Sequence, residues 1–526
     1  MYDIIIQNGL VIDGSGSPGC RMDLAIAGDK IAAVGSLPSD LSTQHIDASH
    51  KIVAPGFIDI HSHSDFIYLY DPQADGKIRQ GITTELIGQC GLSGAPMLGA
   101  YRKQRQEKLT GRDISITWTD LEGYLSRLEG VHPLGNLATL VGHGNLRGGV
   151  LGYENRLTTD QELGRMKELL EASMQTGAFG FSSGLIYPPG VYSSTEELIA
   201  LAKVAASHGG IYATHLRSEG DLLEEAISEA LYIAEQTRIS LQIAHLKTYG
   251  KRNWSKLPAA LTLIEAARTK GLSVHADRYP YTASFTDLDV LLPAWAWEGG
   301  RAATIGRLAD DLQRRKMTEE IVALNPDPAF WSTVIISSVH NEHNRSLEGQ
   351  SLEKISTDQG ISPWEALYDL LRDEELMVTA IFFAMNEHNL EQILAKPYVM
   401  IGTDSAARPL SGTREQGKPH PRGFGSFPRI LAQWTGAGKL LSWEQAIHKM
   451  TGLPAQKLGL VDRGILQPGW YADVVVLDPG TVRDQADFTD PFQPPGGIDH
   501  VIVNGTFVVK GGALTGKQPG RVLRKQ

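Results

Sequence analysis

Short apolar runs alternate with amphipathic stretches through most of the chain. From Pro55 to about residue 440, β-rich runs that end in Gly, His or Asp are followed by segments with apolar residues at helical spacing. The clearest predicted helices span 159–175, 195–208, 222–236 and 257–270. This alternation predicts a parallel sheet with helical crossovers, and eight such units would close a TIM-like (β/α)8 barrel. The active site of such a barrel lies at the carboxyl ends of its strands.

Both ends of the chain show a different pattern, with short strands and Gly, Ser or Pro turns. Residues 3–9 and 500–505 both read as a strand that ends in Asn-Gly, and a helix predicted at 442–450 separates the second group from the barrel. We predict an α/β protein in which residues 55–454 form the barrel. Residues 1–54 and 455–526 would form one small, discontinuous β-sandwich domain beside it, so that each end protects an edge strand of the other.

The segment 288–331 is long for a loop of a barrel. It contains Trp295, Trp297 and a charged amphipathic stretch, 302–322, that predicts one helix. Two interpretations stay open, a lid over the pocket and a packing insert at the periphery.

Composition narrows the class of protein. The formal net charge of −11 disfavours nucleic acid and anionic membranes as partners. No apolar run approaches the roughly 18 to 20 residues that cross a bilayer. Two cysteines in 526 residues argue against a disulfide scaffold, and the chain starts as a strand instead of a signal sequence. We expect a soluble, cytoplasmic protein with a small-molecule substrate, and the sequence leaves its oligomeric state open.

Candidate metal ligands follow several of the predicted strands. His61 and His63 are two apart after an apolar run, and residues i and i+2 of a strand point to the same side. Asp404 follows the apolar run 398–401. Two imidazoles and a carboxylate suit a hydrolytic Zn²⁺ that keeps a position open for water.

Further candidates stand at other strand ends. His215 and His245 each end a short apolar run, about one βα unit apart. Cys90 ends another such run, and the neighbouring histidines favour ligation over its alternative role as a small buried hydrophobe. Cys20 lies in a Gly/Ser/Pro turn and is expected to be inert.

These motifs resemble the amidohydrolase superfamily of metal-dependent hydrolases. The resemblance rests on Gly-Phe-Ile-Asp-Ile-His61-Ser-His63, the two later histidines and the final Asp404. Segments 88–91, 184–190, 214–219, 277–281 and 420–428 narrow it to the D-aminoacylase, or N-acyl-D-amino-acid deacylase, branch. Hydantoinase-like relatives carry a carbamylated lysine at the position of Cys90.

The resemblance implies a role for each matched position. A tight Zn²⁺ is expected on Cys90, His215 and His245, and a second, weaker ion on His61, His63 and Asp404 with Cys90 shared. Lys247, Tyr279 and Ser284 fall where the family grips the α-carboxylate of the substrate, and a cation with two hydroxyl groups suits an anion. Tyr187 and Arg422 are further candidates for the pocket.

The predicted reaction follows from this metal chemistry. Bound Zn²⁺ lowers the pKa of water from about 15.7 towards 7, and Asp404 can act as general base and acid in hydrolysis of an N-acyl-D-amino acid. The alternative is a cyclic-amide hydrolase of the hydantoinase or dihydroorotase type, whose expected bridging lysine is absent. A non-catalytic protein on the same scaffold is a third reading. His340 and His343 are expected at the surface, whereas His388 follows a predicted strand end, and a position facing the pocket stays open for it.

Overall fold

The computed structural model describes residues 1–38, 42–410 and 417–526. Its central feature is a ring of parallel strands. Two sheets contribute to it, one in the order β6-β7-β8 and one in the order β9-β10-β11-β12-β13-β17. The strands are β6 (Phe57–Asp59), β7 (Ile82–Ile87), β8 (Asn136–Thr139), β9 (Val141–Gly142), β10 (Gly180–Gly184), β11 (Ile211–His215), β12 (Ser240–Ile243), β13 (Val274–Arg278) and β17 (Val399–Ile401).

The ring closes next to the candidate ligands. Only Leu140 separates β8 from β9, so these two short strands form one continuous strand position that links the two sheets. Among the described residues, the ring therefore has eight strand positions. Ser62 and Ser405 form a parallel bridge, and Asp404 N donates to His61 O at 2.8 Å. The last strand therefore lies beside the first, and the predicted (β/α)8 barrel is confirmed.

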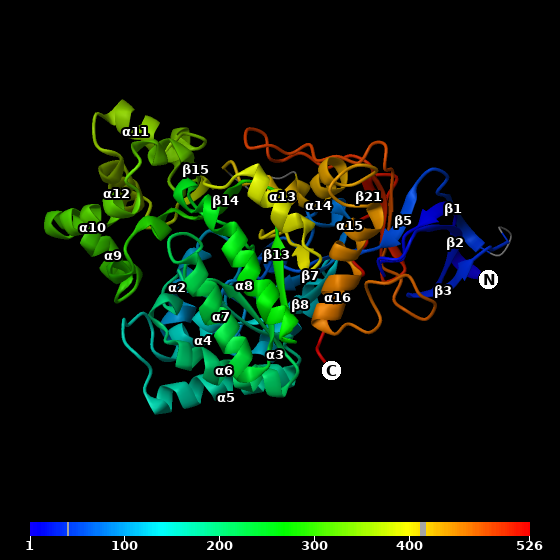
Figure 1. The fold of residues 1–526 in the computed structure, drawn as a ribbon, viewed down its shortest axis with the longest axis horizontal. Helices are drawn as coiled ribbons and strands as arrows, with labels where there is room; N and C mark the ends of the chain where they lie inside the picture. Colours follow the sequence, from blue (N-terminus) through cyan, green and yellow to red (C-terminus); the bar gives the residue numbers. More distant parts are fainter. Residues whose placement is uncertain (39–41, 411–416) are drawn as a thin grey trace.

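Helices cover the outside of the barrel, close to where the sequence predicts them. They are α5 (Asp160–Thr176), α6 (Thr195–Ser207), α7 (Leu223–Thr237) and α8 (Leu257–Thr269), which lie in succession in Figure 1. Helix α5 begins at a capping box of Thr159 with Glu162 and ends at Gly177, which has φ +111°. The apolar faces of all four pack into one buried cluster with the outer faces of the strands.

The carboxyl-terminal segment of the chain packs across the end of the barrel at which the strands begin. Leu137 in β8 pairs with Val522, and Leu523 N donates to Leu137 O at 2.7 Å. Helix α16 (Gly452–Leu458) buries Leu453 and Leu458 in the core inside the strands. The loops that carry the candidate ligands lie at the opposite end of the barrel.

Strands from both chain ends share one sheet, which lies on one side of the barrel in Figure 1. In the described part of the chain this sheet has nine strands, in the order β21-β20-β19-β18-β5-β1-β2-β3 with β4 beside β1. They are β1 (Tyr2–Val11), β2 (Cys20–Ala27), β3 (Lys30–Gly35), β4 (Ser42–Asp47), β5 (Ile52–Pro55), β18 (Val474–Leu477), β19 (Ile498–Val503), β20 (Thr506–Lys510) and β21 (Ala513–Leu514). Because β18 pairs with β5, the two chain ends are one unit. Its boundaries at residues 54 and 455 stay a prediction.

A separate layer is inserted between β13 and β17. Strands β14 (Ala283–Asp287), β15 (Val334–Ser338) and β16 (Thr379–Phe383) form an antiparallel sheet. It shares a core with α9 (Arg301–Leu308), α10 (Asp311–Leu324), α11 (Leu352–Gln359) and α12 (Pro363–Asp373), which lie at the far end of the molecule from β1 in Figure 1. The single helix predicted over 302–322 is wrong, because Asp310 caps α10 and breaks it from α9. The lid role stays a prediction.

The remaining helices are α1 (Ile67–Tyr70), α2 (Gly99–Lys108), α3 (Leu121–Val131), α4 (His143–Val150), α13 (Glu387–Ala395), α14 (Arg422–Arg429) and α15 (Trp443–Met450). Several of them belong to the outer layer of the barrel, where α3 and α4 pack against α5, and α13 and α15 pack against β17. No helix among the described residues is both long and apolar enough to span a bilayer.

One buried carboxyl in the insert gives the protein a pH-dependent stability. Burial, with Asp287 nearby, raises the pKa of Asp289 to about 8, against roughly 3.9 in an unfolded chain. A raised carboxyl pKa stabilises the fold below about pH 4, and this stability is lost as the pH rises towards 8. The stability of Asp289→Asn relative to the natural protein should therefore rise by roughly 1 kcal/mol for each pH unit between pH 5 and pH 8, measured by thermal or urea unfolding. Parallel stability curves for the two proteins would contradict this.

Candidate metal centre

The six predicted ligands lie together at the carboxyl ends of the barrel strands. His61 and His63 follow β6, Cys90 follows β7, and Asp404 follows β17. His215 is the last residue of β11, and His245 comes two residues after β12. Each strand ends at the same rim of the barrel, and this shared rim brings together residues that are more than 300 positions apart in the chain.

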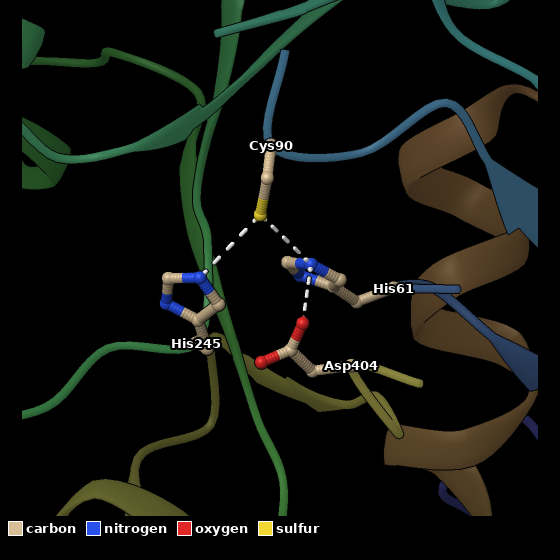
Figure 2. A group of neighbouring side chains, drawn as sticks. All are labelled: His61, Cys90, His245 and Asp404. Carbon is tan, nitrogen blue, oxygen red and sulfur yellow. Dashed lines mark hydrogen bonds and ion pairs between the residues drawn. The ribbon is translucent and has the colours of Figure 1, made fainter. Parts of the chain in front are cut away.

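Four of these residues form one buried cluster, which Figure 2 shows: His61, Cys90, His245 and Asp404. Cys90 Sγ lies 3.3 Å from His61 Nε2 and 3.5 Å from His245 Nε2. The carboxylate of Asp404 approaches His61 Nε2 from the other side, at 3.3 Å. A donor atom of each residue lies within 4.8 Å of the others.

The other two histidines adjoin this cluster. His63 Nε2 lies 3.0 Å from Asp404 Oδ1. His215 belongs to a second group of candidate donors with Glu219 and His245, so that His245 is common to both groups. The ring centroids of His215 and His245 are 4.4 Å apart.

Two carboxylates behind the cluster orient its imidazoles. Asp277 Oδ1 lies 2.9 Å from His61 Nδ1 and also accepts from the backbone N of His245 at 2.8 Å. Glu219 Oε1 lies 2.9 Å from His245 Nδ1. When each Nδ1–H donates to its carboxylate, both Nε2 lone pairs face Cys90, as metal-binding histidines require.

Three of the cluster residues have a backbone conformation that side chains other than glycine rarely adopt. The φ angle is +53° at Cys90, +34° at His245 and +51° at Asp404. Such strain is characteristic of functional sites. Close packing holds it in place, since a Cβ on Gly184 would lie 2.2 Å from the carbonyl oxygen of Cys90.

The charges within the cluster stabilise one another. Burial raises the pKa of the Cys90 thiol, but His61 and His245 outweigh it and hold the pKa well below its usual range. Burial also opposes ionisation of Asp404, yet Arg422 and His61 lower its pKa well below 3.8. The thiolate and the carboxylate are therefore both available as anionic ligands at neutral pH.

A buried network ties the first and last strands of the barrel together beneath the ligands. Lys77 donates to Asp59 and Thr403 and is 1% exposed. Asp59 Oδ1 accepts from the backbone N of Thr403 at 2.9 Å and of His61 at 3.2 Å. The network fixes the backbone on both sides of the pair formed by His61 and Asp404.

The residues present fit a transition-metal ion. Cys, His and Asp side chains converge in a buried space, and this donor set is the one that zinc prefers. In the described part of the chain, neither ring nitrogen of His215 has a hydrogen-bond partner, although the residue is 5% exposed. The carboxylate of Glu219 lies 3.5 Å from His215 Nε2 without hydrogen-bond geometry, and a buried imidazole without hydrogen bonds is costly unless it coordinates a metal. The assignment of the individual ligands stays a prediction.

The residues predicted to bind a carboxylate lie beside the cluster. Lys247 follows His245 by two residues and donates to Glu219. The Tyr279 hydroxyl is buried and has no hydrogen-bond partner among the described residues, and the guanidinium of Arg422 lies 4.7 Å from the centroid of its ring. Burial raises the pKa of Tyr279, but Lys247 and the two nearby arginines, Arg278 and Arg422, outweigh it, so its pKa is lower than 10. Three cationic side chains therefore surround the Tyr279 hydroxyl, where an anion is expected to bind.

Ser284 and Tyr187 are the two remaining residues predicted to bind substrate. Ser284 lies in β14 at the start of the insert. Tyr187 follows β10, its ring lies 5.1 Å from that of His215, and its hydroxyl is 3.1 Å from Thr286 Oγ1. Their roles in substrate binding stay predictions.

Several features of the site were not predicted from the sequence. Glu219 and Asp277 lie within the motifs 214–219 and 277–281, but nothing in the sequence shows that each contacts a candidate ligand, as the structure does. A sequence signal exists for Asp277, because the run 274–277 follows the predicted helix 257–270 and resembles the strand ends that carry the ligands. His388 lies exposed in the first turn of α13, and His343 is exposed beside Asp373, as expected for a surface residue. Cys20 is exposed at the start of β2 instead of in a turn.

Comparison with known proteins agrees with this geometry. A sequence model described as "Amidohydrolase family" matches residues 44–509. The chain belongs to this family. Among the relatives of this amidohydrolase, D-aminoacylase from Alcaligenes xylosoxydans xylosoxydans is 36% identical over 524 residues, which cover 100% of this chain and 98% of the relative.

Solved structures place the amidohydrolase in the D-aminoacylase branch. N-acyl-D-glutamate deacylase from Bordetella bronchiseptica, solved with zinc and a phosphonate inhibitor, is 34% identical, with a TM-score of 0.84 over 99% of each chain. L-Hydantoinase from Arthrobacter aurescens is 16% identical, with a TM-score of 0.58 over 100% of each chain, and shows only the common fold.

Proposed function

We propose that this amidohydrolase is a zinc-dependent deacylase that hydrolyses N-acyl-D-amino acids to a carboxylate and a free D-amino acid. The observation that carries the proposal is Cys90, which lies between His61 and His245 where a cyclic-amide hydrolase of this superfamily has a carbamylated lysine. Close similarity to D-aminoacylase and N-acyl-D-glutamate deacylase, the latter solved with zinc, supports the same conclusion.

The cluster provides ligands for one tight zinc ion and a second, weaker one. Cys90, His215 and His245 would hold the first, and His61, His63 and Asp404 would hold the second with the Cys90 thiolate shared. When bound, zinc supplies Lewis acidity, which acidifies water and polarises a carbonyl group.

The positive wall of the pocket would bind the α-carboxylate of the substrate. Lys247 supplies a cation and Tyr279 an unengaged hydroxyl, and Ser284 supplies a second hydroxyl from β14. Arg422 adds a guanidinium close to Tyr279. These contacts orient the amide towards the ligand cluster, and Tyr187 would form the wall next to His215.

Asp404 would move the proton in the reaction. Its carboxylate lies between the imidazoles of His61 and His63 and the guanidinium of Arg422, 2.7 Å from Arg422 Nη1. It stays ionised at neutral pH and can accept a proton from the attacking water. The same oxygen can then return that proton to the departing amide nitrogen, so that Asp404 is ionised again at the end of the cycle.

A panel of substrates tests this function. The purified protein should release amino acid from N-acetyl-D-amino acids, and release should stop after chelation and return with zinc. N-acetyl-L-amino acids and a hydantoin serve as the comparison substrates. Ring opening of the hydantoin without release from the linear amides would favour the cyclic-amide hydrolase, and absence of all turnover with zinc bound would contradict both functions.

A further inference from the structure

His420 joins two segments that are distant in sequence, β14 and the segment that carries Arg422. Its Nε2–H donates to the carbonyl oxygen of Ala283 at 3.0 Å, and its Nδ1 accepts from the backbone N of Arg422 at 3.0 Å. The residue is 2% exposed. Both ring nitrogens are therefore engaged, one as donor and one as acceptor, and the hydrogen bonds fix a single neutral tautomer.

A second hydrogen bond connects the same two segments. The guanidinium of Arg422 donates to the carbonyl oxygen of Phe285 at 3.1 Å. Ala283 and Phe285 are the neighbours of Ser284 in β14, so the two hydrogen bonds lie on either side of that residue. These two hydrogen bonds fix the backbone on both sides of Ser284 relative to Arg422.

The surroundings of His420 keep the imidazole neutral and immobile. Burial, with the positive charge of Arg422, lowers its pKa well below 6.5. The ring packs edge-on against Tyr281 at 5.0 Å and against Phe488 at 4.9 Å between ring centroids. Phe488 comes from the long connection between β18 and β19, so the sheet built from the chain ends also supports the junction.

We propose that His420 is a positioning residue that sets the distance between Arg422 and Ser284, and thereby the selectivity of the pocket for a substrate with a free α-carboxylate. The proposal rests on the proposed function, because it concerns the group that an N-acyl-amino acid presents to this wall. His420 itself faces two backbone groups and has no nitrogen left for substrate. Its effect passes through the two side chains that it aligns.

Two substitutions separate this role from simple packing. His420→Leu removes both hydrogen bonds but fills the space, whereas the amide of His420→Gln can donate to Ala283 and accept from Arg422. The substrate pair is an N-acetyl-D-amino acid and its α-carboxamide, which lacks the negative charge. The carboxamide is measured as a substrate or, where it is not turned over, as a competitive inhibitor.

The decisive readout is the selectivity ratio, which compares how well the protein uses or binds the N-acetyl-D-amino acid with how well it uses or binds the α-carboxamide. In the Leu variant it should fall about tenfold or more, since alignment of a charge-assisted hydrogen bond is lost, and the Gln variant should keep most of it. Equal losses for both ligands, or an unchanged ratio, would overturn the proposal. Zinc content and melting temperature are measured for each variant. If the Leu variant does not fold, His420→Asn replaces it, because the shorter amide of Asn reaches only one of the two partners.

Two controls keep this outcome separate from the proposed function. His448 Nδ1–H donates one hydrogen bond to the carbonyl oxygen of Gly14 at 2.9 Å, and the ring contacts the turn after β1, so His448→Leu should leave the ratio unchanged. The natural protein is assayed first. If it releases no amino acid from N-acetyl-D-amino acids, the proposed function fails; if it does, the ratio alone decides the role of His420.

Discussion

Replacing Asp404 by Asn should lower kcat by about a hundredfold to ten-thousandfold, the range over which a general base acts. The carboxylate is ionised because Arg422 lies 2.7 Å from Oδ2, and an amide of the same shape cannot accept the proton. The rest of the cluster does not depend on this residue: Cys90 Sγ keeps its contacts with His61 and His245. The variant should therefore fold and keep about one equivalent of zinc, measured by metal analysis beside steady-state kinetics.

A second ion pair of the same kind provides the control. Asp484 lies 2.9 Å from Nη1 of Arg429, and its side chain is 10% exposed, as is that of Asp404. Asp484→Asn should keep kcat within about threefold of the natural value, because loss of such a pair affects stability more than chemistry. Near-normal turnover by Asp404→Asn, with zinc bound, would assign the base to another group, and Glu219 would be the first to test.

The barrel and its ligands were predictable because both depend on local rules. A strand places every second side chain on one face, and parallel strands end at a common rim, so His61, His63 and Asp404 could be assigned to one site before the structure was known. Helices were predicted within about one residue of their ends where caps such as Thr159 and Gly177 mark them.

Other features depend on contacts that local pattern does not encode. The apolar residues before His388 predict a strand end, but only the structure shows that β16 pairs antiparallel with β14 and β15 in the insert and is not part of the barrel. Glu219 and Asp277 reach His245 and His61 only after the strands assemble. The positive φ angles at Cys90, His245 and Asp404 are imposed by packing, since nothing about these residue types favours them.

Replacing Cys90, the cysteine at the centre of the site, should have the second large effect, a loss of zinc affinity. Cys90→Ser should weaken binding of the tight zinc ion by more than about a hundredfold, since loss of an outer contact to a ligand already costs tenfold to a hundredfold. The natural thiolate is stabilised by His61 and His245, whereas a serine hydroxyl stays protonated and binds zinc weakly. Zinc retention is measured by competition with a chelator, and activity should fall with zinc content and recover only in part at high zinc concentration.

The other cysteine supplies the control, and cobalt supplies a second readout. Cys20 is exposed in β2, so Cys20→Ser should bind zinc as the natural protein does. Cobalt in the natural protein should show the charge-transfer absorption of a metal thiolate, and Cys90→Ser should lack it. If the Ser variant keeps tight zinc and the cobalt spectrum is unchanged, Cys90 is not a ligand. The tight ion would then belong to the second donor group, in which Glu219 joins His215 and His245 without any sulfur.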